Sequence, residues 1–423
     1  MNYKKEIYDN YTLHLIKTDK FKTVDVSVRL TKPFDKNEFA YLRLLEKMIR
    51  FNTTKKYKNI TEISKELERL YNSNLMVKSY AQSKNMIFEC GITMVNPKYT
   101  ELNVYDGLFD LFEEIMFNQK ISDNKFSEEL FETQKNSLIK NIENIKDEPQ
   151  DYAALLFEEI FFKNTVYAEN NLKNIDIFNN ITNEGLSSIY RNLFKSNKVD
   201  ILVIGDFDED IIKSKVKHFT SNIIQNDVSI RDLNIKIKER EEKCYTKQID
   251  TNQSNLLIGC TIKDITEEEK NYKLILYNTI LGCMNNSVLF VNVRELNSLC
   301  YHIGSIINKY TSTIIIESGI NAKNFSLAHT LITKCLEDMC NEETIKPLIK
   351  NAKKTLELAF NDFYDNKTKI MNYYYMNEFD YTPSIEERRK KVSECTIEDI
   401  INLAKKVKIK DVFLLEGVNN EED

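Results

Sequence analysis

The histidines of this chain limit the metal chemistry that it can perform. The 423-residue sequence has only four, His14, His218, His302 and His329. A helical zinc site needs two ligands about one turn apart, and no two of these histidines are three or four residues apart. We therefore expect no local histidine pair to bind zinc, and we interpret each histidine as a surface or satisfied core residue. A site assembled from ligands distant in sequence is the remaining alternative.

Other patterns exclude further kinds of chemistry. The eight cysteines are scattered and form no CxxC pair, so we expect reduced packing residues. With only nine glycines, the chain has no GxGxxG or GxxxxGK[ST] loop to hold a phosphate. A net charge of -6 offers no basic surface for nucleic acid, whereas a basic or extended peptide is a compatible partner.

The composition is that of an ordinary soluble protein, with 42% apolar and 29% charged residues. No stretch approaches the roughly 18 apolar residues needed to span a bilayer. The opening residues, MNYKKEIYDNY, have neither the apolar stretch of a secretory signal nor the arginine-rich pattern of a transit peptide. We expect a cytoplasmic protein that does not cross a membrane.

Hydrophobic periodicity predicts a similar order of elements in the two halves of the chain. In the first half we expect strands at 11–18, 23–30, 75–82, 86–95 and 199–206, with helices at 39–51, 60–71, 102–117, 126–146 and 151–162. In the second half we expect strands at 255–262, 300–307, 311–321 and 411–418, with helices at 271–283, 287–296, 325–340 and 343–366. This weak internal duplication predicts two similar domains.

The predicted domains are residues 1–222 and 243–423, joined by a charged, exposed linker at 223–242. Strands interleaved with long helix pairs indicate an α+β fold. Each domain should contain an antiparallel-rich sheet that helices cover on one face.

Two segments carry a resemblance to a known family. They are YRNLFKSNKVDILVIGDFD at 190–208 and LFVNVRELNSLCYHIGS at 289–305. The chain resembles the insulinase/pitrilysin peptidases over nearly its whole length. The resemblance implies duplicated α+β domains that form a clam-like half chamber around a peptide.

Active members of that family carry an inverted zincin motif, HxxEH, in which two histidines bind zinc and the glutamate activates water. The matching helix here reads Arg43-Leu44-Leu45-Glu46-Lys47, which keeps only Glu46. Two cations replace the two ligands, and a cation neither donates a lone pair nor tolerates a dication nearby. The resemblance therefore implies an inactive homologue that needs no cofactor.

The third ligand in the family is a glutamate on a later helix, seven residues after another acidic position. Our alignment places these positions at Asn141 and Gln134, neither of which is charged. The nearby Asp147-Glu148-Pro149 matches the acidic-proline helix end of the family and supports this register. Glu143 is the alternative if the alignment slips by two residues.

The resemblance assigns a substrate-binding function to Arg294 and Tyr301. In related heterodimers, the subunit without the zinc motif can contribute such an Arg and Tyr to the peptide. Arg294 could donate to peptide carbonyls, and the Tyr301 hydroxyl to charge developing on the scissile carbonyl. The simpler alternative is a surface ion pair and a packed strand aromatic. Ser318, Gly319 and Asn321 could line the same cavity.

Two further features have simpler interpretations. Glu46 is interpreted as a solvated residue or as the partner of Arg43. The tyrosine-rich segment at 371–381 could form an interface or a helix packed on its own domain.

The function that we expect is that of a non-catalytic subunit in a heterodimeric zinc peptidase. A homologous sister with an intact HxxEH would supply the metal, and this chain would complete the substrate chamber and help to bind peptide or unfolded polypeptide. The first alternative is a stand-alone peptide-binding or scaffolding protein. The second is an enzyme with an unrecognised site, for instance one that uses Glu46.

Overall fold

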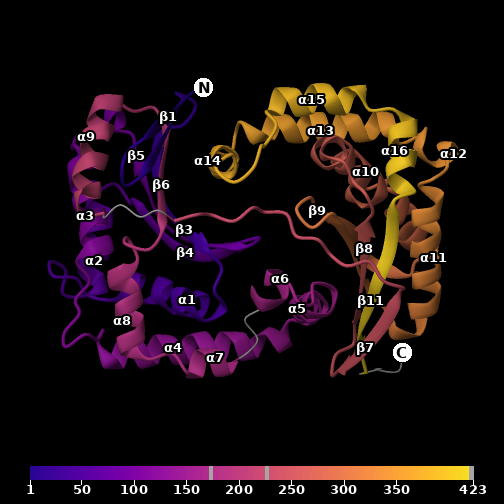
Figure 1. Cartoon of the computed structure of the whole chain (residues 1–423), viewed down its shortest axis with the longest axis horizontal. Coiled ribbons are helices and arrows are strands. Elements are labelled where there is room, and N and C mark those ends of the chain that lie inside the picture. Colours follow the sequence, from indigo (N-terminus) through magenta and orange to yellow (C-terminus); the bar gives the residue numbers. More distant parts are fainter. Residues whose placement is uncertain (171–174, 224–227, 419–423) are drawn as a thin grey trace. The chain divides into compact units, whose positions relative to one another are not determined.

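The computed structural model describes residues 1–170, 175–223 and 228–418 (Figure 1). The chain divides into two compact units. Unit 1 comprises Met1–Glu143, Leu172–Leu233 and Asp365–Tyr381, and unit 2 comprises Asn144–Asn171, Asn234–Tyr364 and Thr382–Asp423. Within the described ranges, no helix is both long enough and apolar enough to cross a bilayer.

The two units contain sheets of the same topology. Unit 1 has β1 (Asn2–Ile7), β2 (Thr12–Lys17), β3 (Thr23–Pro33), β4 (Asn74–Gln82), β5 (Asn85–Val95) and β6 (Lys198–Gly205) in the order β1-β2-β6-β3-β5-β4. Unit 2 has β7 (Lys243–Ile249), β8 (Ser254–Ile262), β9 (Cys300–Asn308), β10 (Thr313–Ile320) and β11 (Val407–Gly417) in the order β7-β11-β8-β10-β9. Without β1 the orders match, and in each sheet the first pair, β2 with β6 or β7 with β11, is parallel. The predicted duplication and α+β class are confirmed.

The α-helices divide between the two units. Unit 1 contains α1 (Lys36–Phe51), α2 (Ile60–Arg69), α3 (Val104–Phe117), α4 (Glu128–Glu143), α7 (Ile175–Asn179), α8 (Asn183–Asn192), α9 (Glu209–Phe219) and α14 (Lys367–Met376). Unit 2 contains α5 (Pro149–Phe161), α6 (Val166–Asn170), α10 (Leu274–Asn278), α11 (Phe325–Asp338), α12 (Glu342–Ile345), α13 (Ile349–Phe363), α15 (Ile385–Glu394) and α16 (Ile397–Ala404).

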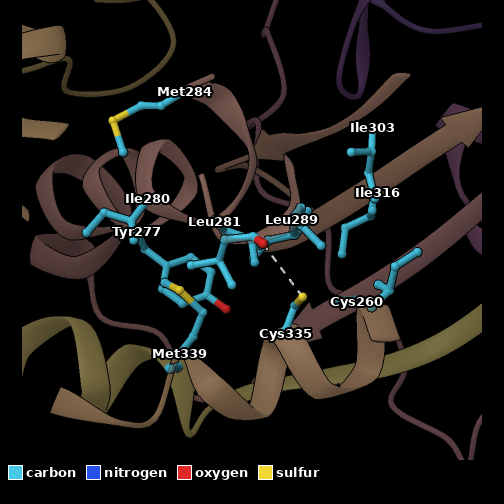
Figure 2. Close-up of a cluster of buried hydrophobic side chains, with 14 of the residues drawn as sticks. Cys260, Tyr277, Ile280, Leu281, Met284, Leu289, Ile303, Ile316, Cys335 and Met339 are labelled. Atoms are coloured by element: carbon cyan, nitrogen blue, oxygen red, sulfur yellow. Dashed lines mark hydrogen bonds between the residues drawn. The ribbon is translucent and has the colours of Figure 1, made fainter. Parts of the chain in front are cut away.

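The main core of unit 2 lies between one face of its sheet and helices α10, α11, α13 and α16, and Figure 2 shows part of it. Tyr277, Leu281 and Cys335 from the helical side pack against Ile303 and Ile316 from the strands. Each fully buried aliphatic side chain in this core, such as Leu281 or Ile316, stabilises the fold by about 1.5–3 kcal/mol. Alternation along β10 directs Ile316 into this core and its neighbour Ile315 to the opposite face.

Helix α5 covers part of that opposite face. Its Phe157 and Phe161 rings stack with centroids 5.2 Å apart and belong to a second core cluster with Leu257 and Phe413 of the sheet. A Cβ atom added to Gly259 in β8 would lie 2.5 Å from the Phe161 ring. Only glycine therefore allows the helix to approach the strand this closely.

Helix α14 has the corresponding position in unit 1. Tyr375 is fully buried, its hydroxyl is hydrogen-bonded to Thr31 of β3, and the Arg29 guanidinium lies over its ring. Arg29 also donates to the side-chain oxygen of Asn372, at 2.7 Å. The tyrosine-rich segment therefore packs on a sheet, but on the sheet formed by the first half of the chain.

The exchange of helices is reciprocal. Helix α5 follows α4 of unit 1 along the chain and belongs to unit 2, whereas α14 follows α13 of unit 2 and belongs to unit 1. Helices cover one face of each sheet as expected, and the exchanged helix adds cover on the other face. The predicted domains, 1–222 and 243–423, describe the two halves of the duplication, and their boundaries stay a prediction.

Most of the described residues in the predicted linker, 223–242, are exposed. Residues 224–227 of this segment lie outside the described residues. In the rest, Leu233 is fully buried, and the Asn85 side chain accepts from the Arg231 amide and donates to its carbonyl at 2.8 and 2.7 Å. These contacts attach residues 231–233 to unit 1, whereas the linker from Asn234 onward belongs to unit 2.

Candidate functional site

Helix α1 carries the degenerate zinc motif. It starts after Asp35, whose side chain accepts from the Glu38 amide at 2.8 Å and satisfies a free donor of the first turn. The apolar positions of α1, including Leu42 and Leu45, are buried in unit 1. Arg43, Glu46 and Lys47 are half-buried between these core positions. All three degenerate positions therefore lie at the edge of the buried face of α1.

Glu46 binds protein groups in place of a metal-bound water. Its carboxylate accepts from the Ser79 amide at 2.7 Å and from the Ser79 hydroxyl at 3.0 Å, both on β4. The Arg43 guanidinium lies 3.2 Å from the other Glu46 oxygen and donates to the Ser79 carbonyl at 3.1 Å. These bonds form a closed network that ties α1 to β4.

The electrostatics of this network do not suit a divalent cation. Burial raises the pKa of Glu46 despite the opposing effects of Arg43, Ser79 and Lys47. A guanidinium remains protonated at any ordinary pH, so Arg43 cannot become a ligand. The residues at the motif therefore do not fit a zinc ion, and the network is best described as a structural tie.

The position expected for the third ligand is also unsuited to metal. Asn141 on α4 is exposed, Gln134 two turns earlier is half-buried, and the alternative residue Glu143 is exposed at the end of the helix. Helices α1 and α4 pack together in unit 1. In the described part of the chain, no hydrogen bond or ion pair joins Asn141 to Arg43, Glu46 or Lys47.

Among the described residues, a different cluster approaches the spacing of a metal site. Potential ligand atoms of His14, Asp200 and Glu378 lie within 4.8 Å of one another in unit 1. Lys198 lies 2.5 Å from Asp200 and 3.2 Å from Glu378, and Lys5 lies 2.6 Å from Glu378. Two ammonium groups thus balance the two carboxylates, so we interpret this cluster as an ion-pair network.

His14 in that network is a satisfied core residue, one of the two interpretations expected for each histidine. It is fully buried, with one ring nitrogen 2.9 Å from the Tyr3 hydroxyl and the other 3.3 Å from Asp200. Burial opposes ionisation of Asp200, but the hydrogen bond with His14 and the charge of Lys198 lower its pKa overall. His218, by contrast, has a largely exposed side chain.

The two residues expected to bind substrate both lie on the surface of unit 2. Arg294 lies in the last turn of a π-helical segment, Phe290–Glu295, and its guanidinium lies over the Phe290 ring at 4.7 Å. Tyr301 in β9 is 82% exposed. Cys300 pairs with Ile320 and His302 with Gly319, so Tyr301 is the extra residue of a β-bulge, which redirects its side chain.

The charge of Arg294 acts on Cys300, the first residue of β9. Burial raises the pKa of Cys300, and the positive charge of Arg294 partly offsets that increase. Arg294 has no ion pair with another described residue, and Tyr301 does not pack in a core. Both side chains are therefore accessible to a ligand, and their function in substrate binding stays a prediction.

The three neighbouring residues have internal structural functions. The Ser318 hydroxyl donates to the His302 carbonyl at 3.0 Å, and the Asn321 side chain accepts from the Lys323 amide at 3.1 Å. A Cβ atom on Gly319 would lie 1.9 Å from the Gln253 side chain. These internal contacts account for the three residue types without a ligand.

Two of the pockets in the described structure were not predicted from the sequence. One of about 620 Å³ in unit 1 lies at the C-terminal end of α1 and the start of α4, away from the degenerate motif. The other, of about 250 Å³ in unit 2, lies between α5 and the strands β9 and β10 and contains Glu158. A signal for the second was visible, because Glu158 interrupts an apolar helical stretch, ALLFEEIFF.

Comparison with known proteins finds similar sequences. Residues 180–356 match the family model "Peptidase M16 inactive domain". The chain is 24% identical over 431 residues to the "Probable inactive metalloprotease YmfF" of Bacillus subtilis, covering 99% of this chain and 98% of that protein. It is 21% identical over 250 residues to the "Uncharacterized zinc protease YmxG" of the same organism, covering 59% of each.

Solved structures agree in fold. The crystal structure of a conserved protein from Enterococcus faecalis V583 matches all of both chains with a TM-score of 0.91 at 24% identity. A peptidase M16 inactive domain from Pseudomonas fluorescens matches all of this chain and 99% of its own with a TM-score of 0.77 at 14% identity.

Proposed function

We propose that this chain, which is similar to the peptidase M16 inactive domain and to a probable inactive metalloprotease, is an inactive member of the M16 (insulinase/pitrilysin) peptidases and the non-catalytic subunit of a heterodimeric zinc peptidase. A homologous sister subunit with an intact HxxEH would supply zinc and the general base. This chain would complete the substrate chamber and bind part of the peptide. The proposal places the complex in the cytoplasm.

The observation that carries the proposal is the network of Arg43, Glu46 and Ser79. In an active peptidase the glutamate must be free to activate a metal-bound water. Here the Glu46 carboxylate accepts two hydrogen bonds from β4 and pairs with Arg43. Any peptide hydrolysis that involves this chain therefore needs catalytic groups from another polypeptide, and the same contacts argue against an enzyme that uses Glu46.

The surface of unit 2 supports the peptide-binding part of the proposal. Strand β9 is the edge of its sheet, so an extended peptide could pair with its free backbone groups. Tyr301 projects from this edge, and Arg294 lies near its start. An accessible guanidinium can donate several bonds to peptide carbonyls, and an accessible phenol can donate to a developing oxyanion.

The relatives support the idea of a pair. Bacillus subtilis has both a probable inactive metalloprotease and an uncharacterized zinc protease that are similar to this chain. Two homologous chains in one organism, only one of them described as a zinc protease, are what a heterodimer of unequal subunits requires. A zinc protease of that kind is the partner that we propose.

A tagged pull-down from the native host under mild conditions, followed by mass spectrometry, tests the proposal. We expect a near-equimolar chain of similar length that carries HxxEH, with zinc in the complex and none in the isolated chain. Recovery of the chain alone, or with unrelated proteins, would contradict the subunit function. A stand-alone peptide-binding or scaffolding function would then be the better explanation.

A further inference from the structure

The pocket beside α5 in unit 2 combines apolar walls with a carboxylate. Its volume is about 250 Å³, less than the roughly 300–1,000 Å³ of typical small-molecule sites. Phe157 and Phe162 from the α5 region, Leu257 from β8, and Ile306 and Ile315 from the strands line it. A pocket of this size and composition suits one long side chain.

Glu158 makes the pocket unusual. Its side chain is half-buried and has no hydrogen bond or ion pair with another described residue. Burial alone raises its pKa, without an opposing contribution from a neighbouring cation. The other carboxylate in the lining, Glu317, accepts from the Gln150 side chain at 2.7 Å and lies 3.8 Å from His302. Glu158 is thus the acid in this pocket that lacks a partner.

A carboxylate at position 158 destabilises the folded state. Ala154 and Phe162 are one turn before and after Glu158, and both line the same pocket. An apolar side chain between them would extend the packed face, whereas a desolvated carboxylate without a partner destabilises the folded state. The folded chain alone therefore does not account for Glu158, whereas a cationic ligand would.

The edge strand gives the pocket an approach for polypeptide. Ile306 and Asn308 of β9 lie directly opposite Ile315 and Thr313 of β10, so all four share the face that lines the pocket. Ile306 is also 61% exposed at this edge. A peptide paired with β9 would direct every second side chain toward this face.

We propose that this pocket binds the side chain of a lysine or arginine in an extended polypeptide. The cationic head pairs with Glu158, and the aliphatic stem lies against Phe157, Phe162 and Ile315. Such a stem buries apolar surface while its charged head keeps a polar partner. The inference rests on the peptide binding proposed above and adds a preference for a basic residue. Ile306 is five positions after Tyr301, so the basic residue binds roughly 16 Å along the strand from Tyr301.

Fluorescence anisotropy with peptide pools tests the preference. The probes are labelled decapeptide pools that contain no lysine or arginine except at position five, which is lysine, arginine, norleucine or glutamate. The full-length chain, and the complex recovered with it, should bind the lysine and arginine pools about tenfold more tightly than the norleucine pool. The glutamate pool should bind most weakly.

Two matched variants locate the effect. Glu158→Gln should abolish the difference between lysine and norleucine. Glu159→Gln changes the adjacent exposed carboxylate, which does not line the pocket, and should preserve the difference. Equal binding of lysine and norleucine pools to the unmodified chain, or an unchanged lysine preference in Glu158→Gln, would overturn the inference and leave the proposed function intact. Failure of every pool to bind would instead contradict peptide binding itself.

Discussion

The guanidinium of Arg29 lies over the Tyr375 ring, 4.5 Å from its centre, although the two residues come from opposite halves of the chain. Arg29 is in β3 of the first sheet, and Tyr375 is in the helix that follows the long helices of the second half. The equivalent contact in unit 2 joins Phe161 of α5 to Gly259 of β8. Each half of the duplication thus supplies a helix to the sheet of the other.

Removal of the Tyr375 side chain should destabilise unit 1. Tyr375→Ala deletes a fully buried ring and its hydrogen bond with Thr31, and we expect the free energy of unfolding to fall by about 3–5 kcal/mol. Urea unfolding followed by circular dichroism measures the change. Tyr381→Ala removes a tyrosine that is 60% exposed and serves as the control. Similar losses in the two variants would contradict the structural importance of the exchanged helix.

The Gly259 contact predicts a steric effect that a second substitution relieves. Gly259→Ala should lower the free energy of unfolding by about 1–3 kcal/mol, because its Cβ would overlap the Phe161 ring. In the Phe161→Leu background the same change should cost much less, which a double-mutant cycle detects. Gly304→Ala is the control, since its nearest atom would be 3.6 Å away. Additive effects at Gly259 and Phe161 would count against the contact.

Restoration of the ligand set should restore metal binding. The triple variant Arg43→His, Lys47→His, Asn141→Glu should retain about one zinc per chain after dialysis, because both histidines would lie one turn apart beside Glu46. Elemental analysis measures the zinc, with the unmodified chain as the control. If the variant with Asn141 unchanged binds zinc equally well, Glu143 is the better match for the third ligand position.

The desolvated carboxylate of Glu158 predicts a pH-dependent stability. Its folded-state pKa is raised above 4.5, so the folded state favours the protonated acid. The preference of the folded state for the protonated acid stabilises the fold fully when the pH is below the unfolded-state pKa. This stabilisation is lost as the pH rises through the folded-state pKa. Glu158→Gln should therefore be more stable than the unmodified chain at pH 7, by on the order of 1 kcal/mol, and similar below pH 4.5. Thermal unfolding at several pH values, with Glu159→Gln as control, measures this; equal stabilities at pH 7 would refute it.

Arg294 and Tyr301 should affect turnover in the reconstituted pair without affecting its assembly. Tyr301→Phe removes only the hydroxyl donor, and we expect kcat to fall by roughly 10-fold or more. Arg294→Ala should mainly raise KM, because it removes contacts with peptide carbonyls. Peptide hydrolysis and size-exclusion chromatography provide the two measurements. Tyr381→Phe is the control, and normal kinetics in both test variants would exclude them from the site.

Much of the architecture could be predicted from local patterns. Alternation predicted β10, where Ile316 enters the main core and Ile315 faces α5. The residue types at Arg43 and Lys47 predicted that this helix does not bind zinc, because a permanently charged cation offers no lone pair to a metal. The repeated order of elements likewise indicated the duplication that the two strand orders confirm.

Only the structure shows which elements the apolar and polar faces of the helices contact. A helical pattern identifies an apolar face on α5 or α14 but contains no information about which sheet will cover it, because the partner lies far away in the sequence. The exchange of these helices, the bond network that occupies Glu46 and the isolation of Glu158 all arise from such distant contacts. The sequence alone therefore determined the fold class, which follows from local periodicity, and the cationic character of Arg43 and Lys47, which follows from residue type. Only the tertiary structure decided how the two halves share their helices and where a ligand could bind, since both depend on contacts between residues that are distant along the chain.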